Sequence, residues 1–298
     1  MLRYAADVRT LCYLALTAAL TLVNWKLGYV HPVLYPITCF MFFTTAVISH
    51  NHNHLSIWKS RGASLMTSWV ISLFYGHPAI GWVPTHNQVH HKYNNTPEDS
   101  SRSPKIFRGN HLLSLLVYPT VTSLVQTKEI KEYIRGLWKK DKRSFWMAIS
   151  EYVVFFGTMI VLFLVDWRRT LLFLLVPQQV ALFLIQCVNF LQHVETDAQS
   201  EWNHSRNFVS PTLNILLFNN GYHTVHHWKP GVHWSLTPKL HAEVAAKIHP
   251  ELLVKSWLKY VGYTYFMRPF TRAVARRRSP LLERSRISTG ATGQLRRP

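Results

Sequence analysis

Residues 170–193 read TLLFLLVPQQVALFLIQCVNFLQH and contain no Asp, Glu, Lys or Arg. About 20 apolar residues in helical conformation cross the hydrocarbon core of a bilayer. A helix on the surface of a soluble protein needs a polar or charged face instead, and this stretch carries no charge on any face. The stretch therefore predicts a membrane-spanning helix with an imidazole, that of His193, at one end.

Three further runs of the chain are nearly free of charge. Residues 10–49 carry only Lys26, and residues 62–91 and 109–127 carry no charge at all. We therefore predict an all-α integral membrane protein in which about four transmembrane helices form two hairpins. The predicted spans are residues 8–25 and 33–49 for the first hairpin, and residues 145–165 and 170–191 for the second.

The remaining apolar runs predict helices that do not cross. Gly76-His77-Pro78 and Gly81 interrupt one run, which indicates a re-entrant segment, and residues 112–125 fit a helix lying along the membrane interface. We expect one membrane domain over residues 1–270 and a basic, disordered tail over residues 271–298. Within that domain, residues 50–143 and 193–270 are expected to form a cytosolic helical cap that holds the metal site.

Charge predicts the orientation in the membrane. The formal net charge is +19, residues 128–143 hold seven basic and three acidic residues, and the chain from Arg268 onward holds nine Arg against one Glu. Basic runs beside membrane spans favour cytoplasm and anionic lipid over nucleic acid. Only Lys26, Arg168 and Arg169, of 33 basic residues, fall in the loops on the other side. Both termini and the cap are therefore predicted to be cytoplasmic.

Histidines form three clusters that follow the ends of apolar runs. Residues three or four apart on a helix share a face, so each cluster aims several imidazoles in one direction. His52 lies about 200° round the helix from His50 and is excluded. A single pair at this spacing is as often polar surface as metal ligand, but three clusters on one membrane face indicate a site. The clusters are His50 and His54; His86, His90 and His91; and His223, His226 and His227.

The chemistry of these clusters is selective. Neutral imidazole suits zinc, copper, iron and nickel, whereas oxygen ligands suit magnesium and calcium. Eight histidines exceed the needs of one tetrahedral zinc and fit two metals with open positions. The three cysteines form no CxxC pair, so thiolate metal sites are not expected.

The three histidine clusters, called the first, second and third box below, resemble the histidine boxes of the membrane fatty acid desaturase–hydroxylase superfamily. Its members carry HxxxH or HxxxxH, then HxxHH or HxxxHH, then HxxHH, and they hold two irons on the cytosolic side of four spans. The similarity runs from about His50 to His233. It implies two Fe (Fe2+/Fe3+) as cofactor and O2 as co-substrate.

Acyl-CoA desaturases, which the chain also resembles, have one more ligand histidine after the last span and an Asn four residues earlier that reaches the metal through water. The resemblance thus implies His193 as a ninth ligand and Asn189 as a water-mediated contact. A histidine that merely caps the helix end is the alternative. Glu195 and Asp197 are candidates to orient ligand imidazoles, or else solvated loop acids. The first and second boxes differ in spacing from acyl-CoA desaturases, so the resemblance assigns no substrate subgroup.

We therefore expect an oxidoreductase that uses O2 to oxidise an unactivated C–H bond in a long acyl or lipid chain, most simply as a fatty acid desaturase. Hydroxylation, carotenoid ketolation and oxidative decarboxylation on the same scaffold remain alternatives. The chain has no GxGxxG fingerprint and no cysteine cluster, so a separate ferredoxin or cytochrome donor is expected. A membrane zinc hydrolase would need HExxH, and a metal transporter would need ligands at mid-membrane. Neither pattern occurs.

Overall fold

The computed structural model describes residues 1–107 and 109–267. Two compact units make up the chain. Unit 1 comprises Met1–Asn87 and Thr127–Ile185, and unit 2 comprises Gln88–Gln126 and Gln186–Pro298. The predicted tail, residues 271–298, lies outside the described residues.

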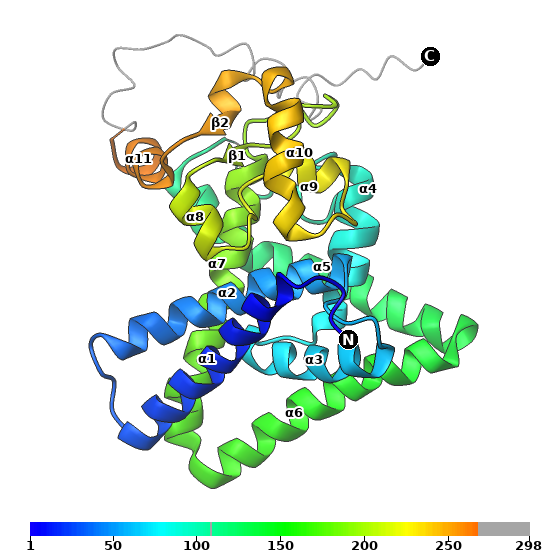
Figure 1. The fold of residues 1–298 in the computed structure, drawn as a ribbon, viewed down its shortest axis with the longest axis vertical. Coiled ribbons are helices and arrows are strands. Elements are labelled where there is room, and N and C mark those ends of the chain that lie inside the picture. The colour runs from blue at the N-terminus through cyan, green and yellow to red at the C-terminus, as the bar shows by residue number, and fades with distance from the viewer. Residues whose placement is uncertain (108, 268–298) are drawn as a thin grey trace. The chain divides into compact units, whose positions relative to one another are not determined.

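The predicted first hairpin is present in unit 1. Helices α1 (Asp7–Leu27) and α2 (Leu34–His54) pack against each other, as Figure 1 shows in dark blue and blue. Their contact is polar in places: Asn24 Nδ2 donates to Thr38 Oγ1 at 2.8 Å. Such hydrogen bonds between helices are typical where lipid offers no competing partner.

The apolar run that Gly76 and Gly81 interrupt forms an α-helix, a short 3-10 helix and a π-helix in turn. Helix α3 (Arg61–Tyr75) ends at Gly76, which adopts φ 92°. A Cβ at Gly76 would lie 2.6 Å from Gln178 Cβ, so only glycine lets this turn approach the helix that carries Gln178. The short helix η1 (Ala79–Gly81) and the π-helix η2 (Val83–His90) follow.

The second predicted hairpin corresponds to one long helical stretch with a break. Helix α6 (Lys142–Thr170) leads through the π-helical η3 (Leu171–Leu175) into α7 (Val176–His193). Asp166 adopts a non-helical φ of −157° and ψ of 96°, and the green ribbon turns sharply here in Figure 1. The break falls in the predicted connection between residues 165 and 170, while the crossing of a membrane by the two flanking segments stays a prediction.

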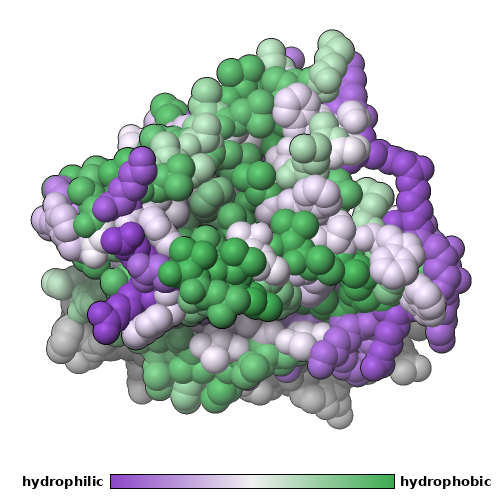
Figure 2. Space-filling view, turned by 90° about the horizontal axis from the view of Figure 1, so that it is seen from below, coloured by the Kyte–Doolittle hydropathy of each residue, from purple (hydrophilic) through white to green (hydrophobic). Residues whose placement is uncertain are grey.

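Two stretches among the described residues are long and apolar enough to cross a membrane, Asp7–Leu27 and Lys142–His193. Helix α2 has the length but not the apolarity, and its last turns carry the polar first box. On α6 many apolar side chains are exposed, Leu164 by 83%. The face in Figure 2 is largely hydrophobic, with hydrophilic residues gathered near its edges. The count of four spans stays a prediction.

Helix α5 (Leu112–Lys140) is longer than the predicted interfacial helix, because it continues through the basic segment as a helix with Pro119 inside it. The long polar side chains of that segment favour helix. The predicted end of this helix at residue 125, placed where the apolar residues end, was therefore wrong.

Unit 2 consists of short elements around a small core. Val225, Val244, Ile248 and Leu252 form one buried hydrophobic cluster of this unit, and Tyr118, Phe190 and Val194 form another. Strands β1 and β2 pair in parallel over two residues each, the one addition to the expected all-α architecture in the described part of the chain. The elements are α4 (His91–Tyr93), β1 (Asn207–Phe208), α8 (Pro211–Leu216), α9 (His223–Trp228), η4 (Trp234–Leu236), α10 (Thr237–Val244), η5 (Ala245–Lys247), η6 (Pro250–Leu252), β2 (Leu253–Val254), α11 (Trp257–Val261) and η7 (Gly262–Met267).

Candidate metal centre

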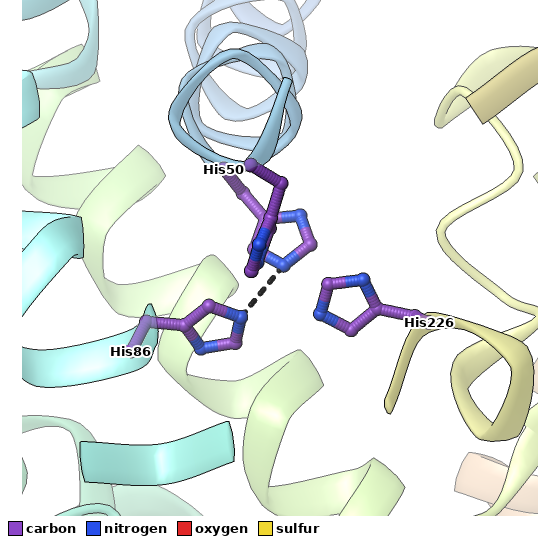
Figure 3. A group of neighbouring side chains, drawn as sticks. His50, His86 and His226 are labelled. Carbon is purple, nitrogen blue, oxygen red and sulfur yellow. Dashed lines mark hydrogen bonds between the residues drawn. The ribbon is translucent and has the colours of Figure 1, made fainter. Parts of the chain in front are cut away.

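The first histidine cluster lies in unit 1, at the end of α2. His50 and His54, one turn apart on α2, and His86 on η2 bring ring nitrogens within 4.8 Å of one another. The Nε2 atoms of His50 and His86 are 2.9 Å apart, and Figure 3 shows their rings facing each other. Trp82 packs on both rings, with centroid distances of 5.2 and 5.1 Å, and so covers one side of the cluster.

His52 points elsewhere, as its angular position on the helix predicts. Its Nδ1 accepts from the Ile57 N–H at 3.2 Å, so its Nε2 carries the proton and donates to Ser64 O at 3.3 Å. Both ring nitrogens are thus occupied by the backbone. His52 therefore lies outside the histidine cluster, and its exclusion from the metal ligands stays a prediction.

The second box divides between the two units. The spacing predicts a shared face for His86 and His90, but their nitrogens belong to different clusters. The residues between them are wound as the π-helix η2. Wider helical turns of this kind are rare and occur frequently at functional sites.

Four histidines converge inside unit 2. His90 is the last residue of η2, His193 ends α7, and His223 and His227 lie on α9. One ring nitrogen of each lies within 4.8 Å of those of the others. The Nε2 of His193 is 3.1 Å from that of His90 and 2.8 Å from that of His223. His193 is fully buried, so the imidazole implied by the resemblance lies inside the cluster.

Asp99 contacts the far side of the His90 ring. Its Oδ2 is 2.7 Å from His90 Nδ1 and accepts from the Asn95 N–H at 2.8 Å. Its Oδ1 accepts from the N–H and hydroxyl of Ser101, both at 2.7 Å. Burial alone would raise the pKa of Asp99, but His90 and these donors hold the pKa well below its usual range. An ionised carboxylate only accepts, so His90 donates through Nδ1 and its Nε2 is the ring nitrogen that faces the cluster.

The remaining two predicted ligands form a pair in unit 2. The Nε2 atoms of His91 and His226 are 2.9 Å apart. The ring of His91 also stacks near that of His227, with centroids 4.5 Å apart. Every one of the nine predicted ligands therefore lies beside at least one other within its own unit.

The donor set fits a transition metal. Ligand nitrogens about 2.0–2.1 Å from a metal lie about 2.8–3.4 Å from one another, which matches the Nε2 separations of 2.8, 3.1 and 3.2 Å around His193 and His223. Burial, followed by neighbouring His91 and His223, lowers the pKa of His227 well below 6.5. The ring is then neutral at pH 7, and neutral imidazole is the form that binds metal.

Both loop acids proposed to orient imidazoles accept hydrogen bonds from backbone N–H groups. Asp197 Oδ1 accepts from the Gln199 N–H at 3.2 Å in a local turn, and Glu195 Oε1 accepts from the Asn110 N–H at 3.3 Å. Asp99, which sequence reasoning missed, is the carboxylate in contact with a ligand imidazole. Its only sequence signal is that it is an acidic residue in the polar loop after the second box. That loop has no periodic pattern from which its direction could be predicted.

Asn189 is one helical turn before His193, as expected. Its Nδ2 donates to the Tyr118 hydroxyl at 2.6 Å, and that hydroxyl donates to Ser101 O. Asn189 is thus linked through Tyr118 to the loop that contains Ser101 and Asp99, and Asp99 contacts His90. Its water-mediated contact with a metal stays a prediction.

Comparison with known proteins agrees with this geometry. No curated protein and no solved structure gave a significant match. The family model described as fatty acid desaturase matches residues 24–259, a range that contains all nine predicted ligand histidines. With membrane-length apolar helices and clustered histidine nitrogens, this match over most of its length places the chain in the fatty acid desaturase family.

Proposed function

We propose that this chain is an O2-dependent di-iron oxidoreductase that desaturates a long acyl chain. The observation that carries the proposal is the clustering of histidine nitrogens within each unit, in a member of the fatty acid desaturase family. His50, His54 and His86 cluster in unit 1, and the other six predicted ligand histidines lie together in unit 2. The proposed ligands are His50, His54, His86, His90, His91, His193, His223, His226 and His227.

Two irons, when bound, supply the reduction of O2 and the removal of hydrogen from an unactivated C–H bond. The chain's own residues bind and orient. Neutral imidazoles supply the lone pairs, and Asp99 fixes the ring of His90 so that Nε2 faces the metal. Burial of His90 and His193 keeps bulk water from the ligands. Asn189 is proposed to contact the metal through water.

The electrons must come from another protein. Reduction of O2 during desaturation consumes an electron pair beyond that taken from the substrate, and the sequence shows no flavin, nicotinamide or iron–sulfur motif. A ferredoxin or cytochrome donor with an acidic surface would suit the basic segments, which we propose to face the cytoplasm.

Product analysis tests the proposal. Cells expressing the chain are fed a defined saturated fatty acid, and its products are analysed by mass spectrometry. Desaturation removes a pair of hydrogens and adds no oxygen, whereas hydroxylation or ketolation adds oxygen and oxidative decarboxylation shortens the chain. Loss of the product in the His50→Ala/His54→Ala variant ties it to this site. Oxygenated or shortened products in place of the alkene would assign one of those other reactions.

Purified protein should contain two irons per chain. Elemental analysis that instead gave a single zinc and no iron would overturn the di-iron proposal, whatever the products.

A further inference from the structure

Unit 1 contains two cavities away from the histidine cluster, and Trp58 lines both. One, of about 540 Å³, is polar and has Arg3, Lys59, Arg61 and Arg143 in its lining. The other, of about 550 Å³, is an apolar groove whose lining includes no charged residue. Both volumes fall within the range of about 300–1,000 Å³ typical of ligand-binding cavities.

The basic rim is built by the folded N-terminus. The Arg3 N–H donates to Ile57 O at 2.8 Å, and the Lys59 N–H donates to Met1 O at 3.1 Å. The Arg3 guanidinium donates to Ser56 O at 3.0 Å. These bonds hold Arg3 and Lys59 beside the start of α3, where Arg61 lies.

The acidic residues that line this cavity have hydrogen-bond donors, whereas two of its basic residues have no acidic partner in the part of the chain that the structure describes. Asp141 accepts from the N–H and hydroxyl of Ser144, and Glu151 accepts from the Ile80 N–H. Both acids are therefore occupied by donors. Across residues 1–107 and 109–267, Lys59 and Arg61 make no ion pair. The cavity keeps positive charge that an anion would complement.

The apolar groove shares one lining residue, Trp58, with the basic cavity. Its lining comes from α1 (Leu11 and Leu14), α3 (Met66 and Val70) and α6 (Val154). Trp58 lines both cavities, and its Nε1 donates to Thr67 Oγ1 at 2.8 Å. A tryptophan with a satisfied N–H between polar and apolar regions is typical of the membrane–water interface.

We propose that the two cavities together bind an anionic phospholipid, with its phosphate among Lys59, Arg61 and Arg3 and an acyl chain along the groove. A free phosphate ester would use only the basic cavity, and a free acyl chain only the groove. None of the nine proposed metal ligands lines either cavity. The lipid is therefore a bound partner that braces α1, α3 and α6, separate from the chain that reacts.

Lipid binding to the full-length protein in neutral detergent is measured by native mass spectrometry. The wild type should bind phosphatidylglycerol at least tenfold more tightly than phosphatidylcholine. Lys59→Gln/Arg61→Gln should weaken binding of phosphatidylglycerol about 25-fold, since each basic residue near an anionic lipid contributes about fivefold. The control Lys128→Gln/Lys131→Gln removes equal charge from residues of α5 that line neither cavity and should change binding less than twofold.

A second variant tests the groove. Val70→Trp, at an exposed position of α3, fills the groove and should weaken both lipids. Equal binding of the two lipids by the wild type, an equal loss in the control pair, full competition by glycerol phosphate, or no effect of Val70→Trp would each overturn the proposal. The thermal unfolding midpoint and the elution volume of each variant in detergent, compared with the wild type, show that the variants fold, and these measurements do not depend on the proposed reaction.

Discussion

Asp99 shows how a single residue can set the direction of a ligand. Four donors hold its carboxylate, one of them His90 Nδ1. The carboxylate both fixes the ring and raises the basicity of the opposite nitrogen. Removing its charge leaves the ring in place but weakens the ligand.

Asp99→Asn is therefore expected to lower metal affinity by about 10–100-fold, as losses of such partners commonly do. Iron retention against a graded series of chelator concentrations measures this. Asp197→Asn is the matched control, because its carboxylate caps a local turn, and it should retain iron as the wild type does. Equal retention in the two variants would show that Asp99 does not tune the site.

His193→Ala is expected to abolish turnover and to lower iron content, because it removes one nitrogen from a buried cluster and opens a ligand position. His52→Ala is the control: His52 is also buried and hydrogen-bonded but lies outside the cluster, so its iron should remain. Elemental analysis and turnover of both variants decide the matter. Full iron and normal turnover in His193→Ala would reduce the site to eight histidines and make His193 a helix-end residue.

At the scale of elements, the third box depends on its neighbours. Helix α9 has only six residues, and helices this short are not stable alone in water. The Thr224 N–H donates to Asn207 Oδ1 at 3.0 Å, and the Gly221 N–H donates to Asn214 Oδ1 at 3.1 Å. Strand β1 and helix α8 therefore position the start of α9, and with it His223.

Gly221→Ala tests this support. A Cβ at Gly221 would overlap the Phe208 carbonyl oxygen, so β1 and the start of α9 must move apart. We expect a loss of about 1–3 kcal/mol of stability together with weaker iron binding, measured by thermal unfolding in detergent and by elemental analysis. Gly231→Ala, where a Cβ meets nothing within 4 Å, should change neither. An unchanged melting midpoint in Gly221→Ala would mean that the contact relaxes without cost.

At the scale of the whole molecule, charge predicts the orientation in the membrane. Basic residues concentrate in the segments that flank the predicted spans on one side, and three lie in the opposite loops. Even numbers of spans return the chain to its starting side. We therefore place both termini and the metal site in the cytoplasm as a proposal.

Labelling of single cysteines in intact cells tests this orientation. In a background with Cys12, Cys39 and Cys187 replaced by Ala, a membrane-impermeant maleimide should modify Tyr29→Cys from outside. It should modify Glu98→Cys only after the cells are opened. Both positions are exposed in the structure, so accessibility to the reagent depends on the side of the membrane. Modification of Glu98→Cys in intact cells would reverse the proposed topology.

The sequence by itself determined the properties that repeat along the chain. Uncharged runs predicted the helical hairpin of α1 and α2 and the break near Asp166, because hydrophobicity and helix-breaking residues act locally. Helical spacing separated His52 from His50 and His54 correctly. The order of the boxes was sufficient to predict the family.

Only the tertiary structure decided which residues meet across loops. It paired His90 with Asp99, brought His193 to His223, and placed His86 in a different cluster from His90. The loop after the second box, which contains Asp99, has no periodic sequence pattern, and the six-residue helix α9 is not stable by itself. Contacts with other segments therefore set the positions of Asp99 and of the histidines on α9. Convergence of side chains from distant segments is a property of packing, and no local pattern encodes it.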